Sequence, residues 1–527
     1  MSDLICKRPS QLLSVSDVWA LPTWLILAAG YYAWTWSHVL ATFGGDNAVY
    51  LMTAESYSPY FSHSHVAQFF ADHSQYPPLF PLFLAFLGGG KNILVSHVIT
   101  TTFLVAALPV FYLLLKTQGL GGWKSVTLAT LFAILPGTYM EALDILSENL
   151  FLLLTLTALL FVTLAESSAA PAKWLWAAAL AIVAACLTRS AGIALAVAFG
   201  IYLWLNRVPG KMILAGAAIL PMFLWQAFGQ GPGRSDYYRS LAQKFSHHPL
   251  QSLRSQVGVE MHALAYGWLK NFINARYAIW AIGLIGLLCL AGTVHRLSKK
   301  RLDGIYVALY LALILIWPFP AEAIRFVFVI LPILLMQGVL LATNATRPIA
   351  AKAPLARTVP AAVLLIPALL AAPTLLLTIQ RFQTPLPPNL EAYKHTSGWY
   401  APDPRKAANQ IQFSAAFEGS FAPVKRVVPP GACILSIKPP IVGYLANRMS
   451  AAPPLANLGP SEFNEAIRKS ACRYLYLSPF TSPTFPEPFY PAKRLGSTMS
   501  EVAAYRVTDP TNGATGIVGV LGEMEQQ

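Results

Sequence analysis

The sequence contains little charge. Of its 527 residues, 37 are Lys or Arg and 23 are Asp or Glu, so charged residues make up 11% of the chain. An ordinary soluble protein carries about 25%. A soluble enzyme of two or three domains is therefore excluded, because so few charges cannot cover its surface. The hydrophobic share of 55% also excludes a disordered or fibrous chain. The apolar residues occur in blocks long enough to cross a bilayer, which indicates a polytopic membrane protein.

Cysteine is also scarce, and the five Cys residues show none of the spacings that bind metals. Cys186 and Cys289 lie in apolar segments, where a free thiol behaves as a small hydrophobic side chain. Only Cys433 and Cys472 share a polar region. They could pair if that region faces an oxidising compartment, although the sequence supplies no geometry for the bond.

The apolar blocks predict eleven membrane-spanning helices, since about 20 apolar residues cross the hydrocarbon core. Only Thr188-Arg189-Ser190 separates the fifth block from the sixth, and one long helix there would reverse the sidedness of everything downstream. The predicted spans are 18–39, 93–115, 124–140, 147–165, 173–188, 190–206, 211–228, 277–295, 303–317, 325–344 and 358–380.

Basic residues orient these spans. With the N-terminus inside, Lys and Arg fall in the short inner segments, whereas the outer turn 141–146 is acidic and 318–324 carries only Glu322. This positive-inside pattern predicts a multi-pass protein of a cell inner (plasma) membrane, with a cytoplasmic N-terminus and an extracytoplasmic C-terminus. It also accounts for the net charge of +14, so we expect no nucleic-acid partner. We expect the first span to remain as an anchor, because it lacks a small-residue cleavage site.

All substantial polar segments then face the outer side. We expect a transmembrane module over residues 1–382 with outer loops 41–91 and 229–276, followed by an extracytoplasmic α/β domain over 383–527. The domain would act as a scaffold or dock the acceptor. Turn residues and buried-strand patterns predict strands at 432–437, 473–477 and 502–507 in this domain, and a helix at 461–469.

The first outer loop holds an acid just beyond the first span. Asp46 and Tyr50 are four residues apart, so on a helix they share one face. A carboxylate at the mouth of a bundle can act as a general base when burial raises its pKa. Asp after Gly-Gly is equally typical of a helix N-cap, and both interpretations stay open.

Other polar residues of the outer side have two interpretations each. Tyr76, beside the rigid corner Pro77-Pro78, could line a sugar or lipid site or belong to an interfacial aromatic belt. The loop histidines, His73 among them, fit solvated side chains better than metal ligands. Arg189 and Arg325 suit a phosphate, although Glu322 could neutralise Arg325 internally. Acids of the outer turn, such as Asp144 and Glu148, favour helix capping.

Five motifs, read in order, resemble the GT-C superfamily of polyprenyl-phosphate-sugar glycosyltransferases, and in particular the protein O-mannosyltransferase and lipid A aminoarabinose transferase group. The resemblance covers about residues 18–345. The motifs are GGDNAVYL (44–51), YPPLFPLFLA (76–85), SENLFLLLTLTALL (147–160), LTRSAGIAL (187–195) and EAIRFVFVILPILL (322–335).

The resemblance implies a GT-C-like fold of about 11 transmembrane helices and an inverting sugar transfer to an acceptor hydroxyl on a glycan, lipid or protein. Asp46 matches the family's first-loop catalytic acid, which would deprotonate that hydroxyl. Arg189 and Arg325 match basic positions for the lipid phosphate, which an arginine can stabilise without a metal. The substrate-binding residues that we expect around Asp46 are Tyr50, Glu55, His73, Tyr76, Arg189, Glu322 and Arg325.

The chain departs from the family pattern at Asn47, where many relatives have a second acid. No metal ligand or cofactor is therefore assigned, and a divalent metal remains an alternative. Two other functions compete with the transferase. One is an O-antigen ligase or polymerase that uses the basic segment 229–276, with His247, His248 and His262. The other is a lipid or sugar transporter, although these spans carry few of the polar residues that transport needs.

Overall fold

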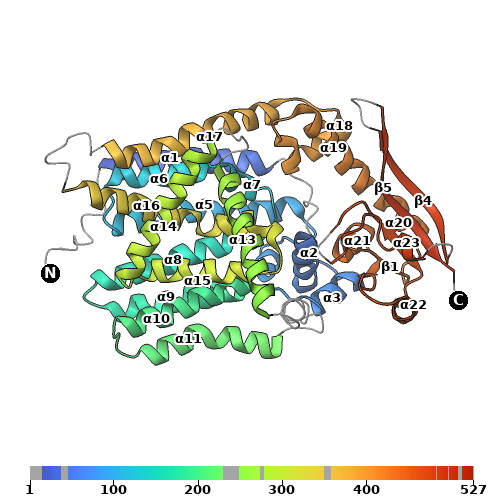
Figure 1. Cartoon of the computed structure of the whole chain (residues 1–527), viewed down its shortest axis with the longest axis horizontal. Helices are drawn as coiled ribbons and strands as arrows, with labels where there is room; N and C mark the ends of the chain where they lie inside the picture. Colours follow the sequence, from blue (N-terminus) through green and yellow to red (C-terminus); the bar gives the residue numbers. More distant parts are fainter. Residues whose placement is uncertain are drawn as a thin grey trace.

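The computed structural model describes residues 15–36, 45–229, 249–272, 278–348, 358–481, 484–495, 498–508 and 513–525. Its helices form a bundle, and a smaller domain with a β-sheet lies at one end of that bundle (Figure 1). This arrangement confirms the predicted fold class, an α-helical membrane module with a small α/β C-terminal domain.

A helix occupies each of the eleven predicted spans. Seven helices in the described residues are long and apolar enough to cross a membrane. The count of eleven spans stays a prediction, because the remaining helices are shorter or more polar. The helices at the predicted spans are α1 (Val15–Trp36), α5 (Ile93–Thr117), α6 (Gly122–Ile134) with α7 (Pro136–Glu141), α8 (Glu148–Ser167), α9 (Pro171–Thr188), α10 (Ile193–Leu205), α11 (Lys211–Leu224), α14 (Ile279–Ser298), α15 (Leu302–Leu315), α16 (Ala323–Thr346) and α17 (Val359–Gln383).

The fifth and sixth spans are separate helices. Arg189, between α9 and α10, has extended backbone angles (φ −146°, ψ 140°), which end α9. The short 3-10 turn η2 (Ser190–Gly192) then starts the next helix. A Cβ on Gly192 would lie 2.7 Å from Cys186 Cα, so the chain turns back this tightly only because residue 192 has no side chain.

Helix α16 forms the centre of the bundle and is buried along most of its length. Apolar residues fill this position because a helix surrounded by other helices has no face exposed to water. One of its neighbours is α13 (Pro249–Phe272), which lies inside the segment predicted as the second outer loop. The sequence pattern missed this helix because polar residues such as Gln256 and Glu260 interrupt its apolar run.

The segment predicted as the first outer loop forms three short helices. They are α2 (Gly45–Tyr57), α3 (His65–Asp72) and α4 (Leu79–Phe86). Figure 1 shows α2 and α3 between the bundle and the C-terminal domain. Ser64 caps α3 by accepting a hydrogen bond from the backbone N–H of Ala67 (3.0 Å). The prolines at 77 and 78 directly precede α4, as the predicted corner requires.

The C-terminal domain contains a five-stranded sheet in the order β2-β1-β3-β5-β4. Strand β1 pairs in parallel with β2 and β3, whereas β5 is antiparallel to β3 and β4. The sequence predicted β1, β3, β4 and α22, and it missed β2, β5, the helices α18 to α21 and α23. The elements are α18 (Pro388–Glu391), α19 (Pro404–Gly419), α20 (Phe421–Val427), β1 (Cys433–Leu435), α21 (Pro439–Ala446), β2 (Met449–Ala451), α22 (Pro460–Lys469), β3 (Tyr474–Leu477), α23 (Ala492–Leu495), β4 (Met499–Thr508) and β5 (Thr515–Met524).

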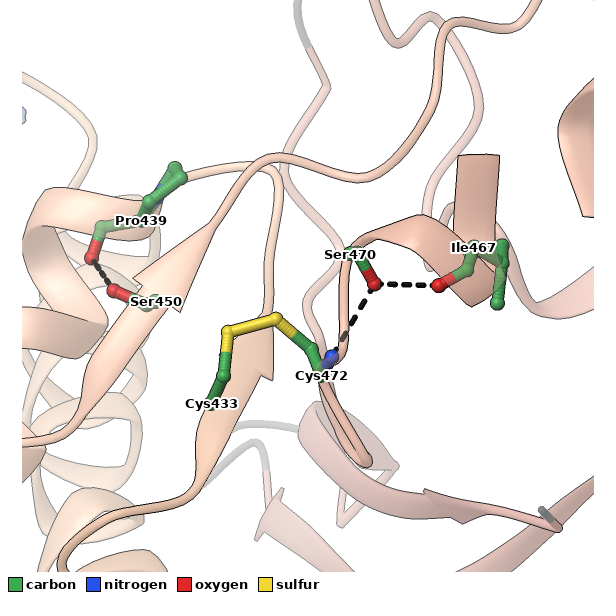
Figure 2. The surroundings of a disulfide bond; sticks show 6 residues. All are labelled: Cys433, Pro439, Ser450, Ile467, Ser470 and Cys472. Atoms are coloured by element: carbon green, nitrogen blue, oxygen red, sulfur yellow. Dashed lines mark hydrogen bonds between the residues drawn. A yellow bond between two sulfur atoms is a disulfide. The ribbon is translucent and has the colours of Figure 1, made fainter. Parts of the chain in front are cut away.

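A disulfide joins Cys433 at the start of β1 to Cys472 just before β3 (Figure 2). The backbone N–H of Cys472 donates to Ser470 Oγ (3.3 Å), which in turn donates to the Ile467 carbonyl at the end of α22 (2.6 Å). The two cysteines that the sequence singled out are therefore paired, while Cys186 and Cys289 are buried and free.

Candidate active site

A cavity of about 550 Å³ lies where the outer-loop helices, the bundle and the C-terminal domain meet. Three separate parts of the chain supply its wall, so no single motif encloses it. Loop one contributes Asp46, Tyr50, Gln75, Tyr76 and Pro77; the bundle contributes Arg189, Ser190, Ala191, Tyr310, Leu313, Ile314, Trp317, Phe319, Glu322, Arg325 and Phe326; the C-terminal domain contributes Lys438, Ala452, Pro453, Leu455, Thr484 and Phe485.

Asp46, in the first turn of α2, presents its carboxylate to this cavity. The Tyr76 hydroxyl donates a hydrogen bond to one carboxylate oxygen (2.7 Å), and Arg325 Nη1 lies 3.1 Å from the other. Burial by itself would raise the pKa of Asp46, but the Arg325 charge and the two hydrogen bonds outweigh it and lower this pKa. Asp46 is therefore ionised at neutral pH and able to accept a proton.

Glu148, at the start of α8, joins the two arginines beneath the cavity. Its fully buried carboxylate lies 2.5 Å from Arg189 Nη1 and 2.6 Å from Arg325 Nη2. Arg325 also contacts Glu322 (2.5 Å). A buried charge is costly without a partner, so Glu148 allows two guanidinium groups to lie at the edge of an apolar bundle.

Arg189 keeps part of its guanidinium available to a ligand. Nη1 contacts Glu148 and donates to Ser147 Oγ (3.3 Å), which also bonds the Tyr50 hydroxyl (2.9 Å). Its Nε and Nη2 make no hydrogen bond within the part of the chain that the structure describes. Arg189 lines the cavity, and its guanidinium lies 5.7 Å from the centre of the Phe326 ring. These free donors suit an anionic group such as a phosphate.

Six of the eight predicted site residues line the cavity. They are Asp46, Tyr50, Tyr76, Arg189, Glu322 and Arg325. The other two are not among its lining residues. Glu55 is buried and pairs with Lys91 (3.2 Å) while accepting from the Ser64 N–H (3.0 Å). His73 contacts the Phe69 carbonyl through Nδ1 (2.8 Å).

The residues present do not form a metal-ligand set. Across the described ranges, no three His, Cys, Asp or Glu side chains gather closely enough to hold an ion. The three carboxylates of the site, Asp46, Glu148 and Glu322, each contact Arg325. Asn47, where a second acid would stand, is buried in α2.

Sequence reasoning did not identify Glu148, Tyr310 or Lys438 as site residues. Glu148 was interpreted as a helix cap, and it does begin α8, but its carboxylate binds both arginines. The sequence did contain a signal for this role of Glu148, because an acid at the end of an apolar span needs a cationic partner. Tyr310 and Lys438 carried no such signal and are brought to the cavity by tertiary packing.

No protein-family model and no curated protein matches the chain. Solved structures do share its fold. ArnT from Cupriavidus metallidurans, bound to undecaprenyl phosphate, aligns with a TM-score of 0.52 and 12% identity over 98% of this chain and 100% of that chain. The Archaeoglobus fulgidus oligosaccharyltransferase, tethered with an acceptor peptide, aligns with a TM-score of 0.52 and 14% identity over 95% of this chain and 74% of that chain. The chain therefore shares the fold of these two solved transferases.

Proposed function

We propose that the protein is a membrane glycosyltransferase that moves a sugar from a polyprenyl-phosphate donor to an acceptor hydroxyl. The observation that carries the proposal is the ionised Asp46 carboxylate in a cavity that Arg189 also lines. A base and an anion-binding group in one cavity are the two requirements for displacing a phosphate from a sugar carbon. The GT-C fold of the two solved transferases supports the same reaction class.

In the proposed reaction, Asp46 accepts the proton of the acceptor hydroxyl. The acceptor oxygen attacks the anomeric carbon from the side opposite the phosphate, which inverts its configuration. The bond between that carbon and the phosphate oxygen breaks, and its electron pair leaves with the polyprenyl phosphate. The developing negative charge is stabilised by the free donors of Arg189. Tyr76 and Arg325 hold the Asp46 carboxylate in place through their contacts with its two oxygens.

A lipid-linked donor fits the position of the cavity. The α15 residues Leu313 and Ile314, with Trp317 just beyond, form an apolar wall on the bundle side, next to Arg189. A polyprenyl chain can lie against such a wall while its phosphate reaches the guanidinium. The disulfide in the C-terminal domain supports an oxidising, extracytoplasmic location for this end of the molecule.

The ligase-like alternative depends on segment 229–276. Its described part, 249–272, contributes no residue to the cavity lining, and His262 lies on α13. His247 and His248 fall outside the described residues. The arrangement around Asp46 therefore favours the transferase.

The test is sugar transfer from radiolabelled polyprenyl-phosphate-sugars in membranes that contain the wild type or Asp46→Asn. We expect the variant to lose transfer by about 10²- to 10⁴-fold, the usual contribution of a general base. Asp72→Asn is the matched control, because Asp72 lies in the same loop, is exposed and accepts a hydrogen bond from Gln68 (2.8 Å). Equal transfer by the wild type and Asp46→Asn would reject Asp46 as the base. A wild type that consumes no donor would reject the transferase.

A further inference from the structure

The C-terminal domain brings one cation to the cavity, Lys438. This residue directly precedes α21 and is half-buried. The two arginines of the site are paired with Glu148, whereas Lys438 Nζ makes no ion pair or hydrogen bond to any described residue. An ammonium that lines the cavity without a protein partner is available to pair with an anionic ligand.

The backbone around Lys438 is fixed on both sides. Its N–H donates to Ser436 Oγ (3.4 Å), and the carbonyl of the next residue, Pro439, accepts from Ser450 Oγ (2.6 Å; Figure 2). The disulfide fastens the same strand at Cys433. The lysine therefore has a set position on the cavity wall, and only its side chain adjusts.

The two walls of the cavity differ in chemistry. The bundle wall carries the charged residues Arg189, Glu322 and Arg325 beside apolar side chains such as Leu313. Of these, Arg189 suits a lipid phosphate, as argued above. Among the described residues, the wall from the C-terminal domain carries one charged residue, Lys438, beside Thr484 and the apolar residues Ala452, Pro453, Leu455 and Phe485. Lys438 is thus the one charge on the described part of this wall, so a substrate that lies against the C-terminal domain would meet it with a negatively charged group.

We propose that Lys438 is a specificity-determining residue that binds a phosphate or carboxylate of the acceptor substrate. This inference rests on the proposed function. The acceptor then lies between the C-terminal domain and Asp46, with its reacting hydroxyl toward the carboxylate. The donor lies on the bundle side.

The experiment compares Lys438→Met, Lys438→Arg and the wild type, with crude cell envelope as acceptor and the radiolabelled donor that the wild type consumes. Lys438→Met should raise the apparent KM for the acceptor about tenfold or more, the cost of one charge-assisted hydrogen bond. The donor KM should stay the same, and Lys438→Arg should retain most acceptor binding. Lys406→Met, an exposed lysine on α19, is the matched control.

Two treated envelopes identify the anion. Alkaline phosphatase removes accessible phosphate monoesters, and amidation with methylamine neutralises carboxylates. The treatment that removes the anion bound by Lys438 should raise the wild-type KM for the acceptor to the value found for Lys438→Met. An unchanged acceptor KM in Lys438→Met, or a raised donor KM, overturns the assignment while the transferase stands. A wild type that consumes no donor overturns the proposed function itself.

Discussion

At the scale of single residues, the site is organised by the pairing of charges. Asp46 has two different neighbours, a guanidinium that lowers its pKa through charge and a phenol that lowers it through a hydrogen bond. Glu148 neutralises the arginines from below and has no exposed surface. Glu148 pairs with both arginines, so its replacement by Gln would remove the buried partner of two guanidinium groups, at a cost of about 3–5 kcal/mol.

The pH dependence of transfer should follow Asp46. Its ionised form is the base, so activity is present above the folded-state pKa and is lost as the pH falls through that pKa. Since this pKa is lowered from its ordinary 3.8, the wild-type kcat/KM should stay level from neutral pH down to about pH 5.

Tyr76→Phe removes one of the three groups that lower the pKa of Asp46, the others being Arg325 and Arg189. The acid limb of the pH profile should therefore move to higher pH. The measurement is kcat/KM against pH for both proteins, with Tyr57→Phe as control because Tyr57 is exposed at the end of α2. An acid limb at the same pH in Tyr76→Phe would contradict the role of this hydrogen bond.

At the scale of elements, α13 positions the start of α16, which carries Arg325. The Asn271 Nδ2 group donates to the Ile324 carbonyl (3.1 Å), one residue before that arginine. Gly267 lies so close to α16 that a Cβ there would be 2.8 Å from the Ala323 carbonyl oxygen. The helix that the sequence did not reveal is thus part of what holds the site together.

Gly267→Ala should destabilise the protein by about 1–3 kcal/mol, because the added methyl group meets backbone that cannot rotate away. Gly258→Ala, on the same helix with open space around it, is the matched control. Both changes gain the same helix propensity of about 1 kcal/mol, so the difference between them isolates the contact with α16. Thermal unfolding in detergent measures it. Equal melting temperatures of Gly267→Ala and Gly258→Ala would show that α13 can move away from α16 without loss of stability.

At the scale of the whole molecule, the C-terminal domain rests on loop one and completes the active-site wall. Ala48, Met52, Val66 and Phe70 of α2 and α3 pack together with Tyr444 of α21 and with Met449. Gly443 lies directly over Phe70, since a Cβ there would be 2.3 Å from its Cε2. This contact sets the distance between the wall that carries Lys438 and the loop that carries Asp46.

Gly443→Leu should displace the domain from loop one and reduce transfer about tenfold or more, because small misplacements at a reacting centre are costly. Gly419→Leu serves as control, since Gly419 is exposed with nothing nearby. The assay is the same sugar transfer, with proteolytic resistance of the domain as a check that it remains folded. Full activity in Gly443→Leu would mean that the domain contact does not position the site.

Much of the fold could be predicted because hydropathy and turn signals are local. Helices lie at all eleven predicted spans, and the break at Arg189 follows from three polar residues between two apolar blocks. Strands β2 and β5 were missed, since β2 is three residues long and β5 is rich in glycine, so neither shows a clear alternating pattern. Asp46 and Tyr50 were found because their spacing places both on one helix face.

The sequence by itself determined where the apolar helices of a membrane protein lie and which loop residues could react. These properties depend on residues that are near one another in the chain. Only the tertiary structure decided that Glu148 binds Arg189 and Arg325 and that α13 supports α16. It also brought Lys438, which is far from Asp46 in the chain, to the cavity that Asp46 lines. The reason is physical: the partner of a buried charge is fixed by which helix ends meet in space, and hydropathy contains no information about that meeting.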